Sequence, residues 1–236
     1  MDESTVPQPT IPTALTARQV AQLVERGPVG GVPLLVVDTR DGVDFEKGAI
    51  PSSIFCGYDG PFEDWMGIVF PDASMWRVVF ICYSNVSPAD VMHSLQRVGF
   101  NNVVGYLEGG MDAWRDEFPE AVSITHRIDP ADFVTEWEAA KGDLVAIDVS
   151  TDEQVADGTW RGSLHFPLVG RTTLERIVAL DAPKVYLFCT GAYRSLMVKS
   201  ILTSLMGYTR ELIEIRGGYM GMQRCPSCTP FLTATA

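Results

Sequence analysis

The sequence predicts an α/β protein made of two consecutive copies of one unit, each a central parallel sheet flanked by helices. Short apolar runs typical of buried strands alternate with segments of helical periodicity. The order of landmarks then repeats: Asp38 and Asp148 are 110 residues apart, and Cys82 and Cys189 are 107 apart. A strand–helix alternation that occurs twice at a nearly constant offset favours two parallel sheets.

This repeat sets the expected domain limits. Residues 1–13 are rich in proline and small polar residues and are expected to form a flexible tail. The first unit is expected at 14–119 and the second at 123–224. Residues 225–236, with two cysteines, are expected to form a C-terminal tail.

The first unit is expected to begin with a helix. Thr16 and Gln19 have the spacing of a capping box, and Gly27 is a stop signal. The remaining elements of this unit are strands at 34–37, 77–81 and 103–107, a helix from Pro88 to Gly99, and a short helix at 111–118.

The second unit repeats this order. Asp129-Pro130 opens a helix, and strands follow at 144–147 and 185–188. Apolar residues at helical spacing from Leu196 to Leu205 predict a helix that ends before Gly207.

The richest chemistry lies in the loop Cys189-Thr190-Gly191-Ala192-Tyr193-Arg194-Ser195, between that last strand and helix. Loop N–H groups and the positive end of a helix dipole favour an anion at one point, and so favour a nucleophilic thiolate. Arg194 adds a fixed cation suited to an oxyanion, and Gly191 is expected to supply the left-handed residue of the turn. We therefore expect Cys189 to be the catalytic nucleophile. The expected substrate-binding residues are Thr190, Gly191, Ala192, Tyr193, Arg194 and Ser195.

The pattern C-x-x-G-x-R-S of this loop resembles the active loop of the rhodanese family. Asp38-Thr39-Arg40 resembles the D-x-R signature of that family, and residues 107–114 (LEGGMDAW) resemble its L-x-G-G-x-x-x-W close. The resemblance covers nearly the whole chain after the first tail and implies two rhodanese-like domains in tandem. It further implies sulfur transfer, through a Cys189 persulfide and without a cofactor, from a small anionic donor such as thiosulfate. The acceptor would be cyanide, a thiol or a protein cysteine.

The two loops differ at the position of the cation. The first loop has the same length, but Ser87 stands where Arg194 stands in the second. Cys82 is therefore interpreted either as the thiol of a degenerate, non-catalytic copy or as a weak sulfur carrier or redox thiol. The second copy also departs from the family, because Ser150 replaces the arginine of D-x-R. Arg40 or Arg161 are candidates to substitute for it.

Cys225 and Cys228 form a C-x-x-C near the C-terminus. This spacing is typical of a redox dithiol or of half a zinc site, and two thiols in a mobile tail are an equal alternative. The three histidines have no ligand-like spacing, so no metal site is expected.

Charge and composition restrict the partners. The net charge of −12, without a basic cluster, argues against nucleic acid and anionic membrane surfaces. No apolar run approaches the length of a membrane span. The start of the chain lacks the basic and apolar regions of a targeting peptide, and the five cysteines are an odd number, so a cytoplasmic protein with free thiols is expected.

Two rival functions remain at this point. The first is a cysteine-based phosphatase or arsenate reductase, but by family comparison such loops are one residue longer. The second is a non-enzymatic interaction module, which Ser87 and Ser150 favour.

Overall fold

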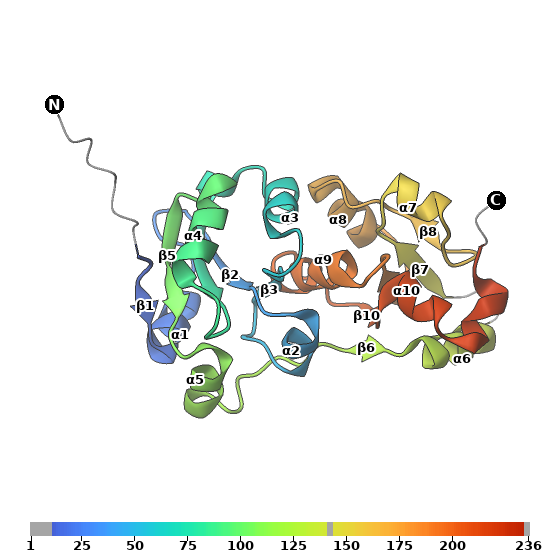
Figure 1. The fold of residues 1–236 in the computed structure, drawn as a ribbon, viewed down its shortest axis with the longest axis horizontal. Coiled ribbons are helices and arrows are strands. Elements are labelled where there is room, and N and C mark those ends of the chain that lie inside the picture. Colours follow the sequence, from blue (N-terminus) through green and yellow to red (C-terminus); the bar gives the residue numbers. More distant parts are fainter. Residues whose placement is uncertain (1–10, 141–143, 234–236) are drawn as a thin grey trace.

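The computed structural model describes residues 11–140 and 144–233. The expected N-terminal tail up to residue 10 and the last residues of the expected C-terminal tail, 234–236, lie outside this range. The described chain is α/β, with two five-stranded parallel sheets that follow one another along the long axis of the molecule (Figure 1). The predicted fold class, α/β with two consecutive units that each have a parallel sheet flanked by helices, is confirmed.

The two sheets have the same strand order. The first consists, in spatial order, of β1 (Ala14–Leu15), β5 (Asn102–Leu107), β4 (Arg77–Ile81), β2 (Leu34–Asp38) and β3 (Ile54–Phe55). The second consists of β6 (Arg127–Ile128), β10 (Glu211–Ile215), β9 (Lys184–Phe188), β7 (Val145–Asp148) and β8 (Leu164–His165).

Helices flank both sheets. Those of the first unit are α1 (Ala17–Arg26), α2 (Gly42–Lys47), α3 (Phe62–Val69), α4 (Pro88–Arg97) and α5 (Gly110–Glu117), with the 3-10 helix η1 (Ala73–Met75). Those of the second are α6 (Pro130–Ala139), α7 (Asp152–Ala156), α8 (Arg171–Val178), α9 (Tyr193–Ser204) and α10 (Gly218–Gln223), with η2 (Pro226–Phe231). The predicted capping box of α1 is confirmed, since Thr16 and Gln19 exchange side-chain-to-backbone hydrogen bonds of 2.9 and 3.3 Å.

Alternate strand residues divide the apolar interior into three layers. In β4, Val78 and Phe80 face a central core, whereas Val79 and Ile81 face an outer core under α1 and α5. Strand β9 repeats this alternation towards the central core and a second outer core under α6 and η2. The central core contains residues from both sheets, so the two units share one hydrophobic interior.

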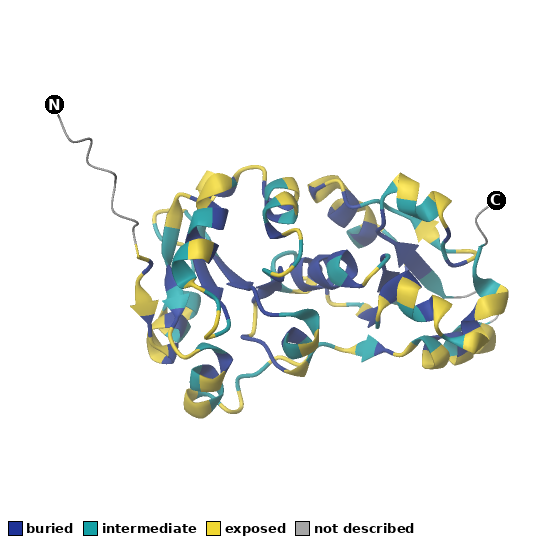
Figure 2. Ribbon diagram, in the orientation of Figure 1, coloured by how far each residue is buried: buried dark blue, intermediate teal, exposed yellow. Residues whose placement is uncertain are grey.

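Helix α9 lies in the middle of this shared interior. Nine of its twelve residues, from Arg194 to Leu202, are buried, and Figure 2 shows the helix dark along most of its length. Two of its hydroxyls reach the first unit: Ser200 Oγ accepts a 2.9 Å bond from Phe55 N, and Ser204 Oγ donates to Ser53 O at 2.9 Å. The helix that carries the expected active loop is therefore held by both units.

The expected tail from residue 225 is not a tail over its described part. Cys228 is fully buried, and the Phe231 ring stacks on the Trp160 ring with 4.9 Å between centroids. A bridge between Trp160 and Leu232 continues this packing. These residues close the second outer core, which is why the chain stays folded past residue 224.

Candidate active site

The Cys189 loop is short and turns directly into a helix. Cys189 follows β9, and α9 begins four residues later at Tyr193. The expectation that Gly191 takes the left-handed conformation is wrong: Ala192, the N-cap of α9, has φ of 71°. The chain turns at Ala192 because the helix begins immediately after it. The first turn of any helix leaves N–H groups without an intrahelical partner, so those of Tyr193, Arg194 and Ser195 border the loop.

The start of α10 closes over this loop. The N–H groups of Tyr219 and Met220 donate to the carbonyls of Cys189 and Thr190, at 2.8 and 3.0 Å. Gly218 makes this approach possible, since a Cβ there would lie 2.1 Å from Cys189 O. The Gly217-Gly218 pair therefore fixes the position of the carbonyl groups of the Cys189 loop.

Arg194 lies beside the loop but does not face open solvent. It is only 6% exposed, and its guanidinium donates to Gln154 of α7 and, at 3.4 Å, to Thr190 Oγ1. Its Cζ also lies 5.3 Å from the centre of the Trp65 ring, which belongs to the first unit. The structure thus brings Arg194 and Thr190 together and places an aromatic side chain of the other unit over the cation.

A residue that the sequence reasoning missed lies behind the thiol. Ser195 Oγ is 3.7 Å from Cys189 Sγ and 2.8 Å from Oε1 of Glu214, a fully buried carboxyl group in β10. Burial raises the pKa of Glu214 to about 7, against the opposing effect of Arg127, whose Nε lies 2.5 Å from Oε2. The available signal was a glutamate inside an apolar strand, Leu212 to Ile215.

Tyr193 points away from the loop and into the first unit. Its hydroxyl donates to Gly57 O at 2.6 Å and lies 3.3 Å from Cys56 Sγ, and its ring meets Phe55 edge-on. The side chain therefore joins the two units, and only the backbone N–H of Tyr193 borders the loop. Gly191 has open space around its Cα.

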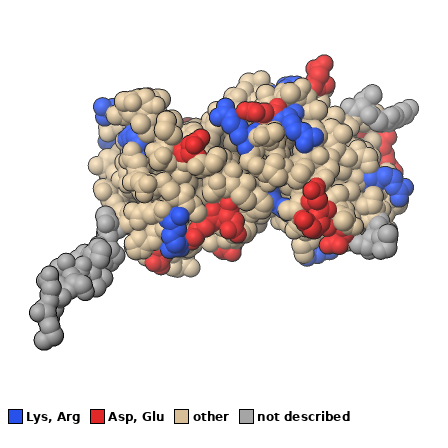
Figure 3. All heavy atoms as spheres, turned by 90° about the horizontal axis from the view of Figure 1, so that it is seen from above, with Lys and Arg blue, Asp and Glu red and all other residues tan. Residues whose placement is uncertain are grey.

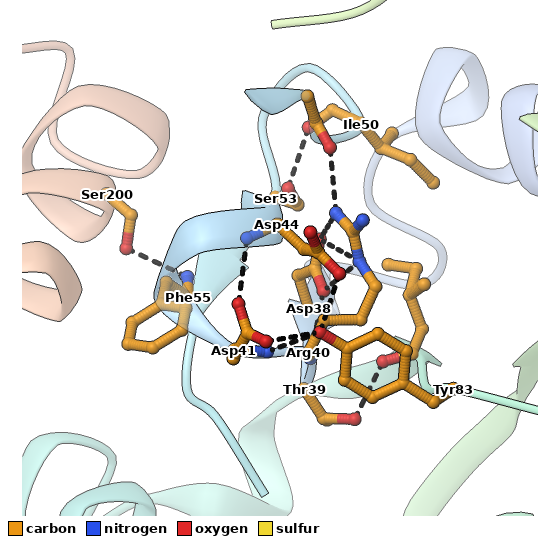
Figure 4. Close-up of polar contacts among 12 residues, drawn as sticks. Asp38, Thr39, Arg40, Asp41, Asp44, Ile50, Ser53, Phe55, Tyr83 and Ser200 are labelled. Atoms are coloured by element: carbon orange, nitrogen blue, oxygen red, sulfur yellow. Dashed lines mark hydrogen bonds and ion pairs between the residues drawn. The ribbon is translucent and has the colours of Figure 1, made fainter. Parts of the chain in front are cut away.

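The aspartates that follow β2 and β7 in the two units have different partners. Arg40 binds Asp38 through two side-chain nitrogens, at 2.9 and 2.6 Å, and also donates to Gly48 O (Figure 4). Asp148 is bonded instead by Thr159 Oγ1 at 2.5 Å and by the N–H of Ser150 at 2.9 Å. Thr159 is therefore the side-chain partner of Asp148, in the role that Arg40 has for Asp38, and neither Arg40 nor Arg161 replaces the missing arginine of the second unit.

The Cys82 loop has another shape. Here α4 begins six residues after the cysteine, at Pro88, and Ser87 is its N-cap, with its side chain 3.4 Å from Asp90 N. Burial and then the charge of Asp38 raise the pKa of the Cys82 thiol to about 11. Cys82 lines a cavity of about 650 Å³, together with Lys47 and Arg115.

Tyr83 fixes one wall of this cavity. Its hydroxyl lies 2.8 Å from both Asp41 Oδ2 and Asp44 Oδ2 (Figure 4), and Asp44 itself lines the cavity. The cavity lining therefore contains charges of both signs.

The C-x-x-C thiols lie in a different layer from Cys189. A hydrogen bond from Ser227 lowers the pKa of the half-buried Cys225, and burial raises that of Cys228 to about 12. Cys228 belongs to the second outer core, whereas Cys189 belongs to the central core. The mobile-tail interpretation is therefore wrong for these two cysteines.

Charges on the face drawn in Figure 3 are scattered, with acidic and basic side chains interspersed and no continuous basic stretch on that face. Over residues 11–140 and 144–233, no cluster of three or more histidine, cysteine or acidic side chains is placed to hold a metal ion. Nor is any helix within these ranges long and apolar enough to cross a membrane.

Comparison with known families gives one match in the sequence. The profile of the rhodanese-like domain matches residues 16–117, the unit that contains Cys82. Curated proteins give no match to the chain.

Several solved structures are similar to the chain. Thiosulfate sulfurtransferase from Pseudomonas aeruginosa is 17% identical, with 95% of this chain and 44% of that chain covered and a TM-score of 0.38. A single-domain sulfurtransferase from Saccharomyces cerevisiae is 18% identical, covering 48% of this chain and 98% of its own, with a TM-score of 0.39. A protein of unknown function from Rhodopseudomonas palustris, described as a possible tyrosine phosphatase, is 22% identical over 47% of this chain and 86% of its own, with a TM-score of 0.34. Likenesses at this level do not specify a reaction.

Proposed function

We propose that the chain is a sulfurtransferase of the rhodanese type that works through Cys189. The match of the rhodanese-like domain profile to residues 16–117 and the strand order that occurs twice support this proposal. The donor is a small anion such as thiosulfate, and the acceptor is cyanide, a thiol or a protein cysteine. The expected cytoplasmic location belongs to the same proposal.

The reaction is a double displacement. The Cys189 thiolate attacks the outer sulfur of thiosulfate; a new S–S bond forms, the S–S bond of thiosulfate breaks, and sulfite leaves with the electron pair. Cyanide then attacks the outer sulfur of the Cys189 persulfide, which gives thiocyanate and returns the thiolate. Cys189 is the catalytic nucleophile, and Arg194 and the N–H groups at the start of α9 hold the anionic end of the donor.

The observation that carries the proposal is the start of α9 at the Cys189 loop. Arg194 is the second residue of that helix, so its charge and the helix dipole act at the same place. At the Cys82 loop the equivalent position is Ser87, outside the helix and without a charge. A sulfur anion is therefore better stabilised at Cys189 than at Cys82.

Access to Cys189 requires a local opening. The residue is 1% exposed and packs in the central core. Arg194 and its partners Gln154 and Trp65 lie beside the loop, on side chains that can rotate without unfolding a sheet. On this proposal an anionic donor takes over the guanidinium from Gln154 and thereby opens the site.

The test is a thiosulfate-to-cyanide assay combined with intact-mass measurement of the donor-treated protein. Wild type is expected to gain one sulfur atom that cyanide removes, and the Cys189→Ser variant to gain none and to form no thiocyanate, because a hydroxyl cannot carry the persulfide sulfur. The matched variant Cys82→Ser is expected to keep nearly full turnover. Equal loss in both variants, in folded protein, would mean that sulfur passes through both loops.

A second candidate function follows from the cavity beside Cys82. A cavity of about 650 Å³ is large enough for a small molecule, and the raised pKa of Cys82 disfavours a nucleophilic thiolate there. On this alternative the first unit binds a ligand and performs no chemistry. If neither Cys82→Ser nor Cys189→Ser changes sulfur transfer, ligand binding without chemistry is favoured as the function of the whole chain.

A further inference from the structure

The side chains of Cys189, Ser195 and Glu214 form a continuous line of polar atoms into the protein. Sγ and Oγ are 3.7 Å apart, and Oγ and Glu214 Oε1 are 2.8 Å apart. Ser195 and Glu214 are both fully buried, so no bulk water competes for these contacts.

The hydroxyl of Ser195 has one hydrogen and cannot donate along both contacts at once. If it donates to the Glu214 carboxylate, its oxygen is free to accept the Cys189 S–H. If Glu214 carries a proton, that proton is donated to Ser195 Oγ, and the Ser195 hydrogen points to a Cys189 thiolate. The distances of 3.7 and 2.8 Å therefore suit two states that differ only in the position of protons.

Resting on the proposed function, we propose that the Cys189 thiolate that attacks the donor forms when Glu214 accepts the Cys189 thiol proton through Ser195. The S–H bond of Cys189 breaks, its proton goes to Ser195 Oγ, and the Ser195 hydroxyl proton goes to Glu214 Oε1. The result is a sulfur nucleophile and a neutral carboxylic acid, with no change in total charge. Glu214 is a positioning residue, because it acts through Ser195 and does not touch the reacting sulfur.

The charges around Glu214 suit this role. Arg127 of β6 binds Oε2 at 2.5 Å and leaves Oε1 for Ser195. Lys199 of α9 contributes a further positive field, and Glu46 of α2 shares Arg127 at 3.1 Å. Because burial opposes these cations and leaves the pKa of Glu214 at about 7, both protonation states of the carboxyl are accessible near neutral pH.

The first unit lacks the same arrangement. Gly109-Gly110 and Gly217-Gly218 are 108 residues apart, and with this offset Tyr106 takes the position of Glu214. Six residues after Cys82 stands Pro88, which has no hydroxyl, whereas Ser195 stands six residues after Cys189. Cys82 is therefore an internal control in the same molecule.

The experiment measures alkylation of Cys189 by the neutral reagent iodoacetamide across pH, with peptide mass spectrometry to separate the cysteines. The proteins are the full chain, Glu214→Gln and Ser195→Ala, with folding checked by circular dichroism. In wild type the rate is expected to rise through about pH 7 to a plateau and to rise again where the free thiol ionises. Both variants are expected to lose the first rise and to react on the order of tenfold more slowly near neutral pH, while Cys82 keeps one profile throughout.

The proposed proton transfer from Cys189 to Glu214 is overturned if the alkylation rate of Cys189 depends on pH in the same way in all three proteins. This includes a rate that is uniformly lower in the variants and a rate that does not respond to pH. A purely structural role of Glu214 or Ser195 would change the rate but not its dependence on pH. The measurement uses no sulfur donor. If the alkylation rate of Cys189 rises in two steps with pH but the Cys189→Ser variant still transfers sulfur, the proposed function is rejected and the proton transfer to Glu214 stands. If the alkylation rate rises in a single step but sulfur transfer depends on Cys189, the proton transfer to Glu214 is rejected and the proposed function stands.

Discussion

The two cysteine loops are equally long, but the following helix begins at different places. Helix α9 begins four residues after Cys189, and α4 begins six residues after Cys82. The fifth position after the cysteine is thus a helical, buried arginine in one loop and an uncharged N-cap in the other. Of the two loops, only that of Cys189 is therefore followed by a helix with a cation in its first turn.

The Gly-Gly pairs that approach the loops extend the comparison. A Cβ on Gly218 would lie 2.1 Å from Cys189 O, whereas one on Gly110 would lie 3.2 Å from Cys82 O, and both glycines have φ of 58°. The two glycines therefore have the same backbone conformation, but Gly218 approaches the Cys189 loop more closely than Gly110 approaches the Cys82 loop.

The largest effect is expected from Gly218→Ala. The left-handed conformation costs an alanine about 1–2 kcal/mol, and overpacking against the loop carbonyl adds about 1–3 kcal/mol. Gly110→Ala, the matched control, is expected to lose only the first amount. Urea denaturation of both variants measures the difference in unfolding free energy, and equal losses would contradict the tighter closure of the Cys189 loop.

The next effect concerns the reactivity of Cys82. Its pKa of about 11 lies two units above the ordinary value of 9.0, so near pH 8 its thiolate fraction is about a hundredfold below that of the unfolded chain. Alkylation of native and urea-unfolded protein should show this ratio, and it should shrink as the pH approaches about 11. A native rate that levels off below pH 9 would show that Cys82 is an activated thiol after all.

A smaller effect is expected from Arg194→Ala. Loss of a charge-assisted contact of about 1.5–3 kcal/mol should lower kcat/KM for thiosulfate by about tenfold to a hundredfold. Arg194→Lys keeps the charge without the planar fork and should recover part of the loss. If reaction with neutral iodoacetamide falls as far as reaction with thiosulfate, Arg194 supports the loop and does not bind the donor.

The smallest effect is expected from Ser87→Ala. Loss of the N-cap of α4 should cost about 1 kcal/mol of unfolding free energy, and sulfur transfer should remain unchanged. Ser84→Ala, in the same loop but outside the cap, provides the control for stability. A loss of turnover in folded Ser87→Ala protein would assign the first loop a part in the reaction.

Much of the fold was predictable because its central elements are long and strongly patterned. The buried strands β2, β4 and β9 and the capped helix α1 follow directly from apolar runs and a capping box. The two-residue strands β1, β6 and β8 were not found, because two residues contain no periodicity. Residues 225–233 were misjudged because their burial depends on Trp160, far away in the sequence.

Only those residues of the candidate site that are close together in the sequence were predictable. The loop pattern identifies Cys189, Arg194 and Ser195, since they are close in sequence. Glu214 and Trp65 reach the loop from other elements, one from the neighbouring strand and one from the other unit. The left-handed residue was assigned to Gly191 from its type, but Ala192 takes that position because the start of the helix decides where the chain turns.

The position of the Tyr193 side chain in the first unit has a consequence for dividing the protein into two fragments. Its hydroxyl is held by Gly57 and Cys56, and a Cβ on Gly60 would lie 2.4 Å from its ring. The side chain of Tyr193, the first residue of α9, is therefore packed inside the first unit. Separation of the two units would remove these contacts and expose the Tyr193 ring, so we expect the second unit to fold poorly when it is expressed without the first.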